Sequence, residues 1–387
     1  MKSTLKAFFK RPTTIVGIVT ALMFQIIFSV VWMTGYNGVT DRIDHLKIAI
    51  VNEDQQFGQQ IAPKLEKELP FSMSQMNSLE EAKVQLNERE LQMVIYLPAD
   101  FTQKASSPEG HASVQYFLNE SNPALIKSMM SSVANQVTAE VNKQAVAAGI
   151  QQTLGQVAAQ LPAEQASAVA QGLSERVKAD IQSSNVVSGM NNQMVPMMMV
   201  LASYVGAMIM GMNLEQSAMG VSGSTTRWNR FAARSVINIV SAVFVSLVGV
   251  SLIAAFGGQM EQGFLNLWLF LFVTLVTFMF ISQMFLYWFG MAGMLFNIIL
   301  LSSQLVTSGA IVPRELLSGF FVRLGDLLPA TYAVEGGMNL LFGGPGMGKD
   351  IAVLLLFTVV GLVVSAIAVA VKRQRTAQPV GALAKQQ

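Results

Sequence analysis

The sequence predicts an α-helical integral membrane protein: six transmembrane helices, with a large α+β extracytoplasmic domain carrying a long helical arm, inserted between helices 1 and 2. Hydrophobic residues make up 52% of the 387 residues and charged residues only 12%, about half the charged share of an ordinary soluble domain. The apolar residues form runs long enough to cross a bilayer core of ~30 Å. The net charge of +2 gives no indication of a nucleic-acid partner.

The first transmembrane helix is predicted at 13–35, after a short amphipathic N-terminus at 1–12. Thr13–Thr34 carries no charge, and its apolar residues continue into Val30, Val31 and Trp32. A cleaved signal peptide would have a shorter apolar core that ends in small residues. The run is therefore interpreted as an uncleaved anchor.

Helices 2–6 are predicted within 191–371. The five apolar runs are 194–213, 233–256, 264–288, 290–312 and 351–371. Trp288–Met291 joins the fourth and fifth helices, and Gly290 suits a tight turn between them. This long apolar stretch allows other divisions, but the charges on both flanks favour two crossings.

Positive charges indicate the orientation of the helices. Lys and Arg gather ahead of helix 1, in a loop at 214–232 between helices 2 and 3, and in a tail at 372–387. With six crossings these three segments lie on one side, and the positive-inside rule makes that side cytoplasmic. Both termini are then cytoplasmic, and the polar region between helices 1 and 2 lies outside.

The region 36–123 is predicted to be an α+β module. Strand alternation and helical spacing predict three strands and two helices, at Leu46–Asn52, Leu91–Leu97, Ser113–Leu118, Phe57–Leu69 and Ser78–Glu90. Ser78 followed by Glu81 is typical of a capping box at a helix start.

The region 124–190 is predicted to be a helical arm. Its apolar residues recur at helical spacing: Ile126, Met130, Val133, Val137, Val141, Ile150, Leu154, Val157 and Leu161. Pro162 ends or kinks the first helix of this arm. One interpretation is an arm or hairpin that stands off the membrane and packs on itself or on a second copy. The other is a flexible stalk.

The residue inventory excludes several kinds of chemistry. The chain has no cysteine and only two histidines, so no disulfide, metal site or catalytic triad is expected. Gly343–Asp350 (GGPGMGKD) matches the start of a phosphate-binding P-loop. However, Asp350 occupies the Ser/Thr position, and no buried strand is predicted before the motif. We therefore expect no nucleotide or other cofactor bound by this chain, and interpret the motif as a turn into helix 6.

Helices 3–5 contain no charged residue after Arg234. Ion-coupled carriers need such groups, so the energy for transport would have to come from another protein. The buried polar candidates are Gln283, Asn297 and Gln304, which would either join helices by hydrogen bonds or line a path for cargo. The 24 methionines fit plain packing, a lipid-like cargo surface or, least well, a copper path.

The segment 313–345 is predicted to be re-entrant. Pro313 stops helix 5, and two apolar pieces follow at Leu316–Leu324 and Tyr332–Phe342, each too short to cross a membrane. They are interpreted as dipping into the outer leaflet or as forming an interfacial loop. The candidate functional residues of this segment are Pro313, Glu315, Pro329 and Tyr332.

Together, Ser308–Leu317 (SGAIVPRELL) and Leu324–Leu341 (LGDLLPATYAVEGGMNLL) resemble the final-helix signature of ABC-2-type membrane permeases. The layout, with AIVNED after helix 1 and IYLPADF later, resembles the YhgE/Pip branch of bacterial permeases. The resemblance implies the bacterial cell membrane and the permease subunit of an ATP-driven exporter. It implies a cytoplasmic ABC ATPase partner, which binds ATP and Mg, and a homodimer or a pair with a related permease.

The resemblance also implies that the loop between helices 2 and 3 contacts the ATPase. The coupling candidates there are Glu215, Gly220, Arg227, Trp228 and Arg230. Anchoring to membrane lipid would equally explain the basic and aromatic members of this set. The absence of charge in the spans favours amphipathic or hydrophobic cargo. The alternative function is a non-transporting cell-surface receptor or secretion-system scaffold, although one anchor would suffice for that role.

Overall fold

The computed structural model describes residues 38–106, 112–157 and 177–371, together with Val31, Thr34 and Tyr36. The chain divides into two compact units. We call Gly38–Ser188 the sheet module and Gly189–Leu341 with the residues from Gly346 onward the helix bundle. The predicted N-terminus, most of predicted helix 1 and the predicted tail lie outside the described residues.

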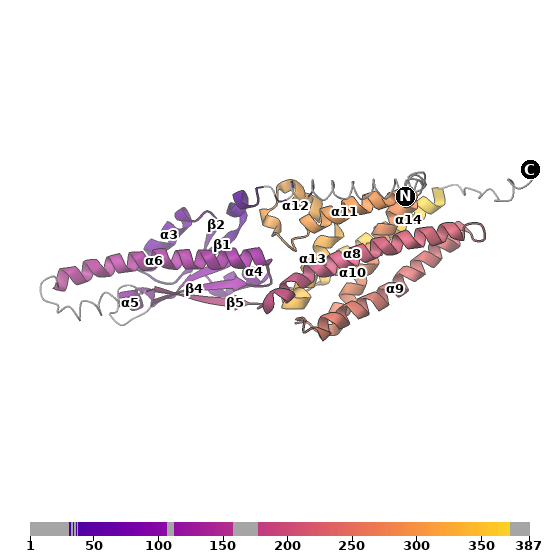
Figure 1. Cartoon of the computed structure of the whole chain (residues 1–387). Helices are drawn as coiled ribbons and strands as arrows, with labels where there is room; N and C mark the ends of the chain where they lie inside the picture. Colours follow the sequence, from indigo (N-terminus) through magenta and orange to yellow (C-terminus); the bar gives the residue numbers. More distant parts are fainter. Residues whose placement is uncertain are drawn as a thin grey trace, which may run out of the picture. The chain divides into compact units, whose positions relative to one another are not determined.

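The sheet module contains a five-stranded mixed sheet in the order β2-β1-β3-β4-β5 (Figure 1). In chain order the strands are β1 (Lys47–Asn52), β2 (Ser72–Met76), β3 (Met93–Leu97), β4 (Ala112–Asn119) and β5 (Val177–Ser184). β1 pairs in parallel with β2 and β3, β4 is antiparallel to β3, and β5 is parallel to β4. The buried strands alternate their side chains between two helix layers.

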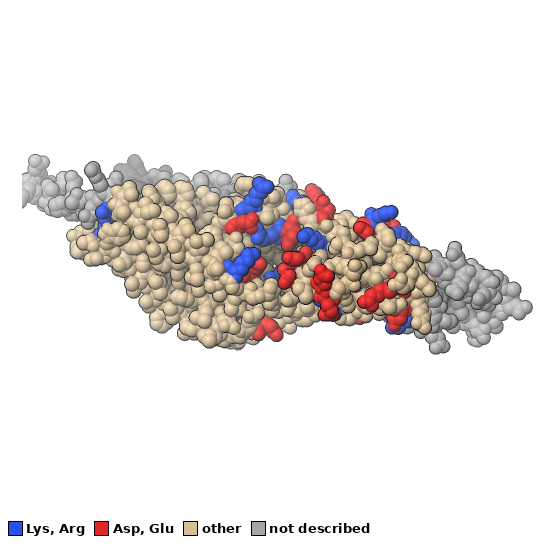
Figure 2. All heavy atoms as spheres, turned by 180° about the vertical axis from the view of Figure 1, so that it is seen from behind, with Lys and Arg blue, Asp and Glu red and all other residues tan. Residues whose placement is uncertain are grey.

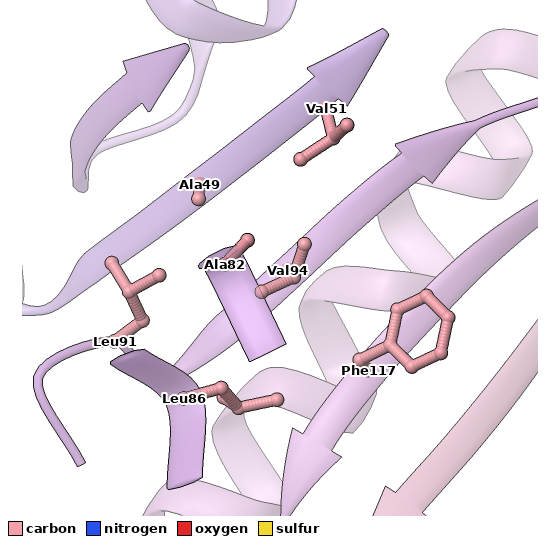
Figure 3. Packing of buried hydrophobic residues seen from close by; sticks show 7 residues of the cluster. All are labelled: Ala49, Val51, Ala82, Leu86, Leu91, Val94 and Phe117. Carbon is pink, nitrogen blue, oxygen red and sulfur yellow. The ribbon is translucent and has the colours of Figure 1, made fainter. Parts of the chain in front are cut away.

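One face of the sheet packs on α4 (Leu79–Asn87) through a small apolar cluster, shown in Figure 3. Its buried members are Ala49, Val51, Ala82, Leu86, Leu91, Val94 and Phe117. The helices α3 (Phe57–Glu68) and α6 (Ala124–Val157) pack on the sheet as well. Lys64 of α3 lies 3.2 Å from Glu140 of α6, and Tyr116 of β4 bonds Thr138 of α6 at 2.8 Å. Both helices therefore cover the face opposite α4.

The sequence prediction for the module was accurate for its periodic elements. The three predicted strands correspond to β1, β3 and β4, and the two predicted helices to α3 and α4. The predicted cap is confirmed, because the Ser78 side chain accepts a hydrogen bond from the Glu81 N–H at 3.2 Å. The edge strand β2 and the short helix α5 (Phe101–Ser106) were not predicted.

The predicted arm, 124–190, is partly different in the structure. α6 is one helix of 34 residues, so the stalk interpretation does not apply to that part. Its apolar stripe from Ile126 to Val141 is buried, and α6 contacts β4 and β5 rather than only itself. The end of the range forms β5, a strand with mostly exposed side chains, and Pro162 lies outside the described residues.

A single carboxylate joins two helix starts in the module. Asp54 is 2% exposed and accepts hydrogen bonds from the N–H groups of Gln56 (3.1 Å), just before α3, and Gly58 (2.7 Å), in its first turn. It also accepts from the N–H (2.9 Å) and hydroxyl (2.6 Å) of Thr102 in α5. A Cβ at Gly58 would lie 2.3 Å from the Asn52 Oδ1, so only glycine fits there. The predicted AIVNED and IYLPADF segments meet at this point.

The helix bundle contains seven α-helices among the described residues. They are α8 (Gly189–Gly220), α9 (Arg227–Ala255), α10 (Phe264–Phe289), α11 (Gly293–Thr307), α12 (Gly319–Asp326), α13 (Pro329–Phe342) and α14 (Gly348–Val371). α10 lies at the centre and packs on α8, α9, α11 and α14. Gly361 of α14 allows close contact with the α10 backbone, since a Cβ there would lie 3.3 Å from the Ile281 nitrogen.

Four stretches of the described residues are long and apolar enough to cross a membrane. They are Gly189–Gly220, Arg227–Ala255, Phe264–Thr307 and Gly348–Val371. The third stretch is not one straight helix, because α10 ends at Gly290 with a positive φ of 59° and α11 turns back. Asn297 of α11 bonds the Ser282 carbonyl of α10, and the Phe285 and Phe296 rings stack at 5.6 Å. This antiparallel packing confirms the predicted hairpin.

The fifth predicted crossing, 290–312, is shorter in the structure than in the prediction. α11 has 15 residues, which is about 22 Å of helix against a bilayer core of ~30 Å. Of predicted helix 1, Val31 is described, and it packs against Met208 and Ile298. The other predicted spans correspond to α8, α9, α10 and α14.

The outer surface of the bundle is apolar. Figure 2 shows the charged side chains gathered over part of the molecule and a broad surface without them elsewhere. α9 buries only one stripe, which consists of Arg234, Asn238, Ala242, Ser246 and Val250. Large apolar residues elsewhere on α9 and α14 are exposed, such as Phe244 and Leu356. Such a surface suits lipid or another apolar helix.

Candidate functional site

The connection between α8 and α9 is short. α8 extends through the polar residues after its apolar run to Gly220, and α9 begins at Arg227. The predicted loop at 214–232 is therefore helical at both ends, with only Val221–Thr226 between the helices. The Thr226 hydroxyl accepts from the Asn229 N–H at 3.2 Å and caps α9.

The predicted coupling residues lie at or near the α8–α9 connection, and their environments differ. Arg227 donates to the Ala370 carbonyl near the end of α14 at 3.2 Å, where a cation suits the helix dipole. Arg230 donates to the Thr225 carbonyl at 2.7 Å and to the Ser222 carbonyl at 3.3 Å, so it holds the turn together. Trp228 is 47% exposed. The two arginines thus bond the chain itself, and Trp228 faces outward.

The remaining two coupling candidates also differ from each other. A Cβ at Gly220 would meet no heavy atom within 4 Å, so packing does not require a glycine there. Glu215 forms an ion pair with Arg234, with its Oε2 2.6 Å from the Arg234 Nη1. The guanidinium carbon of Arg234 also lies 4.1 Å from the ring centre of Tyr287 on α10. This role of Arg234 was not predicted, because Glu215 and Arg234 are 19 positions apart on different helices.

The three polar residues predicted inside the bundle are all buried and all bond another helix or turn. Gln283 donates to the Asn238 Oδ1 of α9 at 2.8 Å. Asn297 accepts from the Tyr204 hydroxyl of α8 at 3.1 Å and donates to Ser282. The Gln304 Oε1 accepts from the Ala330 N–H at 3.2 Å and so caps the start of α13. Of the two predicted roles, these hydrogen bonds fit the joining of neighbouring helices.

The predicted re-entrant segment folds as two short helices after a bend. Pro313 precedes a single 3₁₀ turn, η3 (Arg314–Leu316), in which Glu315 is exposed. α12 and α13 then follow, and they match the two predicted pieces. Pro329 is the first residue of α13, a position that needs no N–H donor.

Side chains fasten α12 to its neighbours. Arg314 pairs with Asp326 at the end of α12 and donates to the Val322 carbonyl at 3.0 Å. The Tyr332 hydroxyl donates to the Asp326 carbonyl at 3.0 Å, and the Thr331 hydroxyl to the Gly325 carbonyl at 2.8 Å. The turn between α12 and α13 is therefore held by several hydrogen bonds.

The P-loop-like stretch has the wrong structural context for phosphate. The element before it is the helix α13, whereas a P-loop follows a strand. Gly343 and Gly344 both have positive φ, 90° and 155°, and form a turn. Asp350 is buried in the first turn of α14, where its charge suits the helix dipole.

The fold and these sites define a multi-pass membrane protein with a folded module ahead of its four described membrane helices in the chain. A family model described as ABC-2 family transporter protein matches residues 14–367. The chain therefore belongs to this family, and it is a membrane permease of the ABC transporter type. Members of the family are transport subunits rather than enzymes, and they generally act with an ABC ATPase.

Two further comparisons add little. A comparison with curated proteins found no match. Among solved structures, a domain of a protein described as an ABC type-2 transporter from Thermotoga maritima MSB8 matches with 17% identity and a TM-score of 0.27. The match covers 35% of this chain and 84% of that domain. A TM-score this low does not establish a shared fold.

Proposed function

We propose that this chain is the permease subunit of an ATP-driven exporter that moves amphipathic or hydrophobic cargo outward. One observation carries the proposal: the charged residues of the described membrane helices lie near the helix ends, and α10 and α11 have none. Coupling to an ion gradient normally needs such groups within the membrane. A separate ATPase, which binds ATP and Mg, then supplies the energy.

The topology belongs to the proposal. We infer six crossings in a bacterial cell membrane, with both termini cytoplasmic and the sheet module outside. Arg227 and Arg230 near the α8–α9 connection support this orientation through the positive-inside rule. The segment after α11, with α12 and α13, would lie in the outer leaflet.

The site assignments follow from this topology. The α8–α9 connection, with Glu215, Gly220, Arg227, Trp228 and Arg230 around it, would contact the ATPase. Gln283, Asn297 and Gln304 stay candidates for a path of cargo, although each already bonds a neighbouring element. The apolar faces of α9 and α14 suit lipid and a second permease chain. The YhgE/Pip branch stays a prediction from the resemblance.

A blocking substitution tests this proposal. A Cβ at Gly223 in the α8–α9 connection and one at Gly346 before α14 would each meet no heavy atom within 4 Å. Neither position is closed to a side chain by packing among the described residues. The experiment is copurification of an ABC ATPase from the same organism, coexpressed with this chain, in mild detergent, followed by measurement of its ATPase rate in nanodiscs.

We expect Gly223→Trp to abolish ATPase binding and stimulation, and Gly346→Trp to leave both unchanged. Loss of binding in Gly346→Trp alone would reverse the proposed orientation. If the unaltered chain retains no ATPase, the exporter assignment is wrong, and the receptor or scaffold function takes its place.

A further inference from the structure

Arg234 of α9 contacts two other helices, α8 and α10, at one end of the bundle. It is 4% exposed, and its guanidinium reaches Glu215 of α8 and the Tyr287 ring of α10. The Phe231 ring lies 5.5 Å from the same tyrosine. The three helices therefore meet at this one cation, close to the α8–α9 connection.

Stability alone does not explain this ion pair. The Nε and Nη2 of Arg234 are buried and have no hydrogen-bond partner in the part of the chain that the structure describes. Removing two charges from water is costly, and apolar residues of similar volume often replace such a pair without loss of stability. A buried and incompletely bonded arginine is thus better explained by a directional role than by packing.

A second polar pair lies one helical turn away. Asn238 follows Arg234 by four residues on α9, and its partner Gln283 precedes Tyr287 by four residues on α10. Arg234 with Tyr287 and Asn238 with Gln283 are two polar contacts between α9 and α10, and together they fix the register of these antiparallel helices. Farther along, the buried stripe of α9 continues with the small residues Ala242, Ser246 and Val250, and the Trp268 Nε1 of α10 donates to the Val243 carbonyl of α9 at 3.4 Å.

We infer that Arg234 is a positioning residue that transmits movement of the α8–α9 connection to α10, with Glu215 as its counter-ion. This inference rests on the proposed function. A displacement of the connection acts on the start of α9 and the end of α8, which the ion pair holds together. Through Tyr287 and Gln283 it then acts on α10, which packs on four other helices. Without Arg234, α10 would follow the connection less closely, because only the bond of Asn238 to Gln283 and the packing of α10 on α8 and α9 would remain.

The decisive experiment separates stability from coupling. In the double variant Glu215→Leu with Arg234→Met, apolar side chains replace the pair, so the chain should still fold. We expect this variant to bind the copurified ATPase as before but to lower its stimulation about tenfold, within the usual range of coupling between sites. Arg323→Gln, which removes an exposed arginine of α12, is the matched control and should change nothing.

Rescue adds a second readout. Arg234→Lys keeps the charge but loses the planar guanidinium and most of the contact with the Tyr287 ring. ATPase stimulation by this variant should therefore lie between that of the unaltered chain and that of Arg234→Met. Exchange of the two residues, Glu215→Arg with Arg234→Glu, should restore more than either single variant does. Full stimulation in the Leu/Met variant would overturn the inference while leaving the exporter assignment intact.

Hydrogen exchange separates coupling from stability. In the Leu/Met variant the amides of α9 and α10 should keep their protection, because apolar side chains replace the ion pair. Faster exchange in both helices would mean that the pair acts through stability, and the inference would be wrong.

Discussion

The sheet module and the helix bundle differ in how completely their buried polar side chains are hydrogen-bonded. Among the described residues of the module, every buried side-chain nitrogen and oxygen has a hydrogen-bond partner. In the bundle, Asn238 Nδ2, Thr274 Oγ1, Ser282 Oγ and Ser302 Oγ have no partner among the residues that the structure describes. In the unfolded module, water forms hydrogen bonds with the polar groups. A polar group that is buried on folding without a partner therefore costs its full desolvation free energy. In the bundle, close backbone contact and apolar packing take a larger share of the stabilisation.

The largest effect is expected from the carboxylate that joins α3 and α5. Asp54→Ala removes four hydrogen bonds to the starts of two helices, which should cost about 3 kcal/mol. Hydrogen exchange of the β1 and β3 amides measures this loss. Glu80→Ala, at a side chain 84% exposed in the first turn of α4, is the control and should cost less than ~0.5 kcal/mol. Equal effects of the two changes would contradict the role given to Asp54.

The next effect is expected in the bundle, at the contact of α13 with α10. A Cβ at Gly336 would lie 2.5 Å from the Phe270 ring, whereas one at Gly337 would meet nothing within 4 Å. Gly336→Ala should destabilise the bundle by about 1–3 kcal/mol through overpacking. Gly337→Ala should be neutral or stabilise it by up to ~1 kcal/mol.

Tryptophan fluorescence measures this pair of variants selectively, because all four tryptophans lie outside Gly38–Ser188. Similar unfolding midpoints for the two variants would mean that the helices relax easily, and that close contact at Gly336 is not a main source of stability.

The pH dependence of the module follows from the same carboxylate. Burial raises the pKa of Asp54, but hydrogen bonds from Thr102, Gly58 and Gln56 outweigh burial and hold the pKa below its ordinary value. The folded state therefore favours the ionised form. Its contribution to stability is present above the unfolded-state pKa of about 3.9 and is lost as the pH falls through the folded-state pKa.

This loss should be smaller than in Asp54→Ala, because a protonated carboxyl keeps part of its bonding. Exchange of the β1 amides, compared between neutral and acidic pH after correction for the intrinsic rate, measures it. Glu120, whose pKa is also lowered by Lys127 and other donors against the effect of burial, should contribute in the same direction. In Asp54→Asn the acid-induced loss should shrink to the contribution of the other carboxylates. If acid destabilises Asp54→Asn as much as the unaltered chain, groups other than Asp54 cause the pH dependence.

The smallest effect is expected from a polar bond between membrane helices. Asn297→Leu removes the bonds to Tyr204 and Ser282, each of the kind that contributes about 0.6 kcal/mol in membrane proteins. The fluorescence midpoint should therefore move only slightly. A loss above ~2 kcal/mol would mean that the bundle depends on its polar bonds as strongly as the module does.

The sequence predicted those elements whose pattern shows burial. The strands β1, β3 and β4 lie in the middle of the sheet, and their alternation is visible. β2 and β5 lie at the edges, so their exposed side chains carry no such pattern. α8 continues past its apolar run through Asn213–Gly220, whose polar composition suggested a loop.

The sequence showed which residues of the candidate site are unusual, but it did not show which partners they bond. Gln283, Asn297 and Gln304 stand out as polar residues in apolar runs, and all three are buried. The pairing of Glu215 with Arg234 depends on the approach of two helices, which no local spacing reveals. Asp54 did carry a local signal, an acidic residue just ahead of a helix start, but its bonds to Thr102 join segments 48 positions apart.

The order of synthesis gives the Glu215–Arg234 pair a further consequence. α8 and α9 leave the ribosome before α10, so at that moment α9 lacks the helix against which it is buried. A lone arginine would hinder entry into the bilayer, but the preceding helix already provides its counter-ion. A chain that stops after α9 should therefore insert less efficiently when Glu215→Gln is present, as glycosylation mapping of the truncated product would measure.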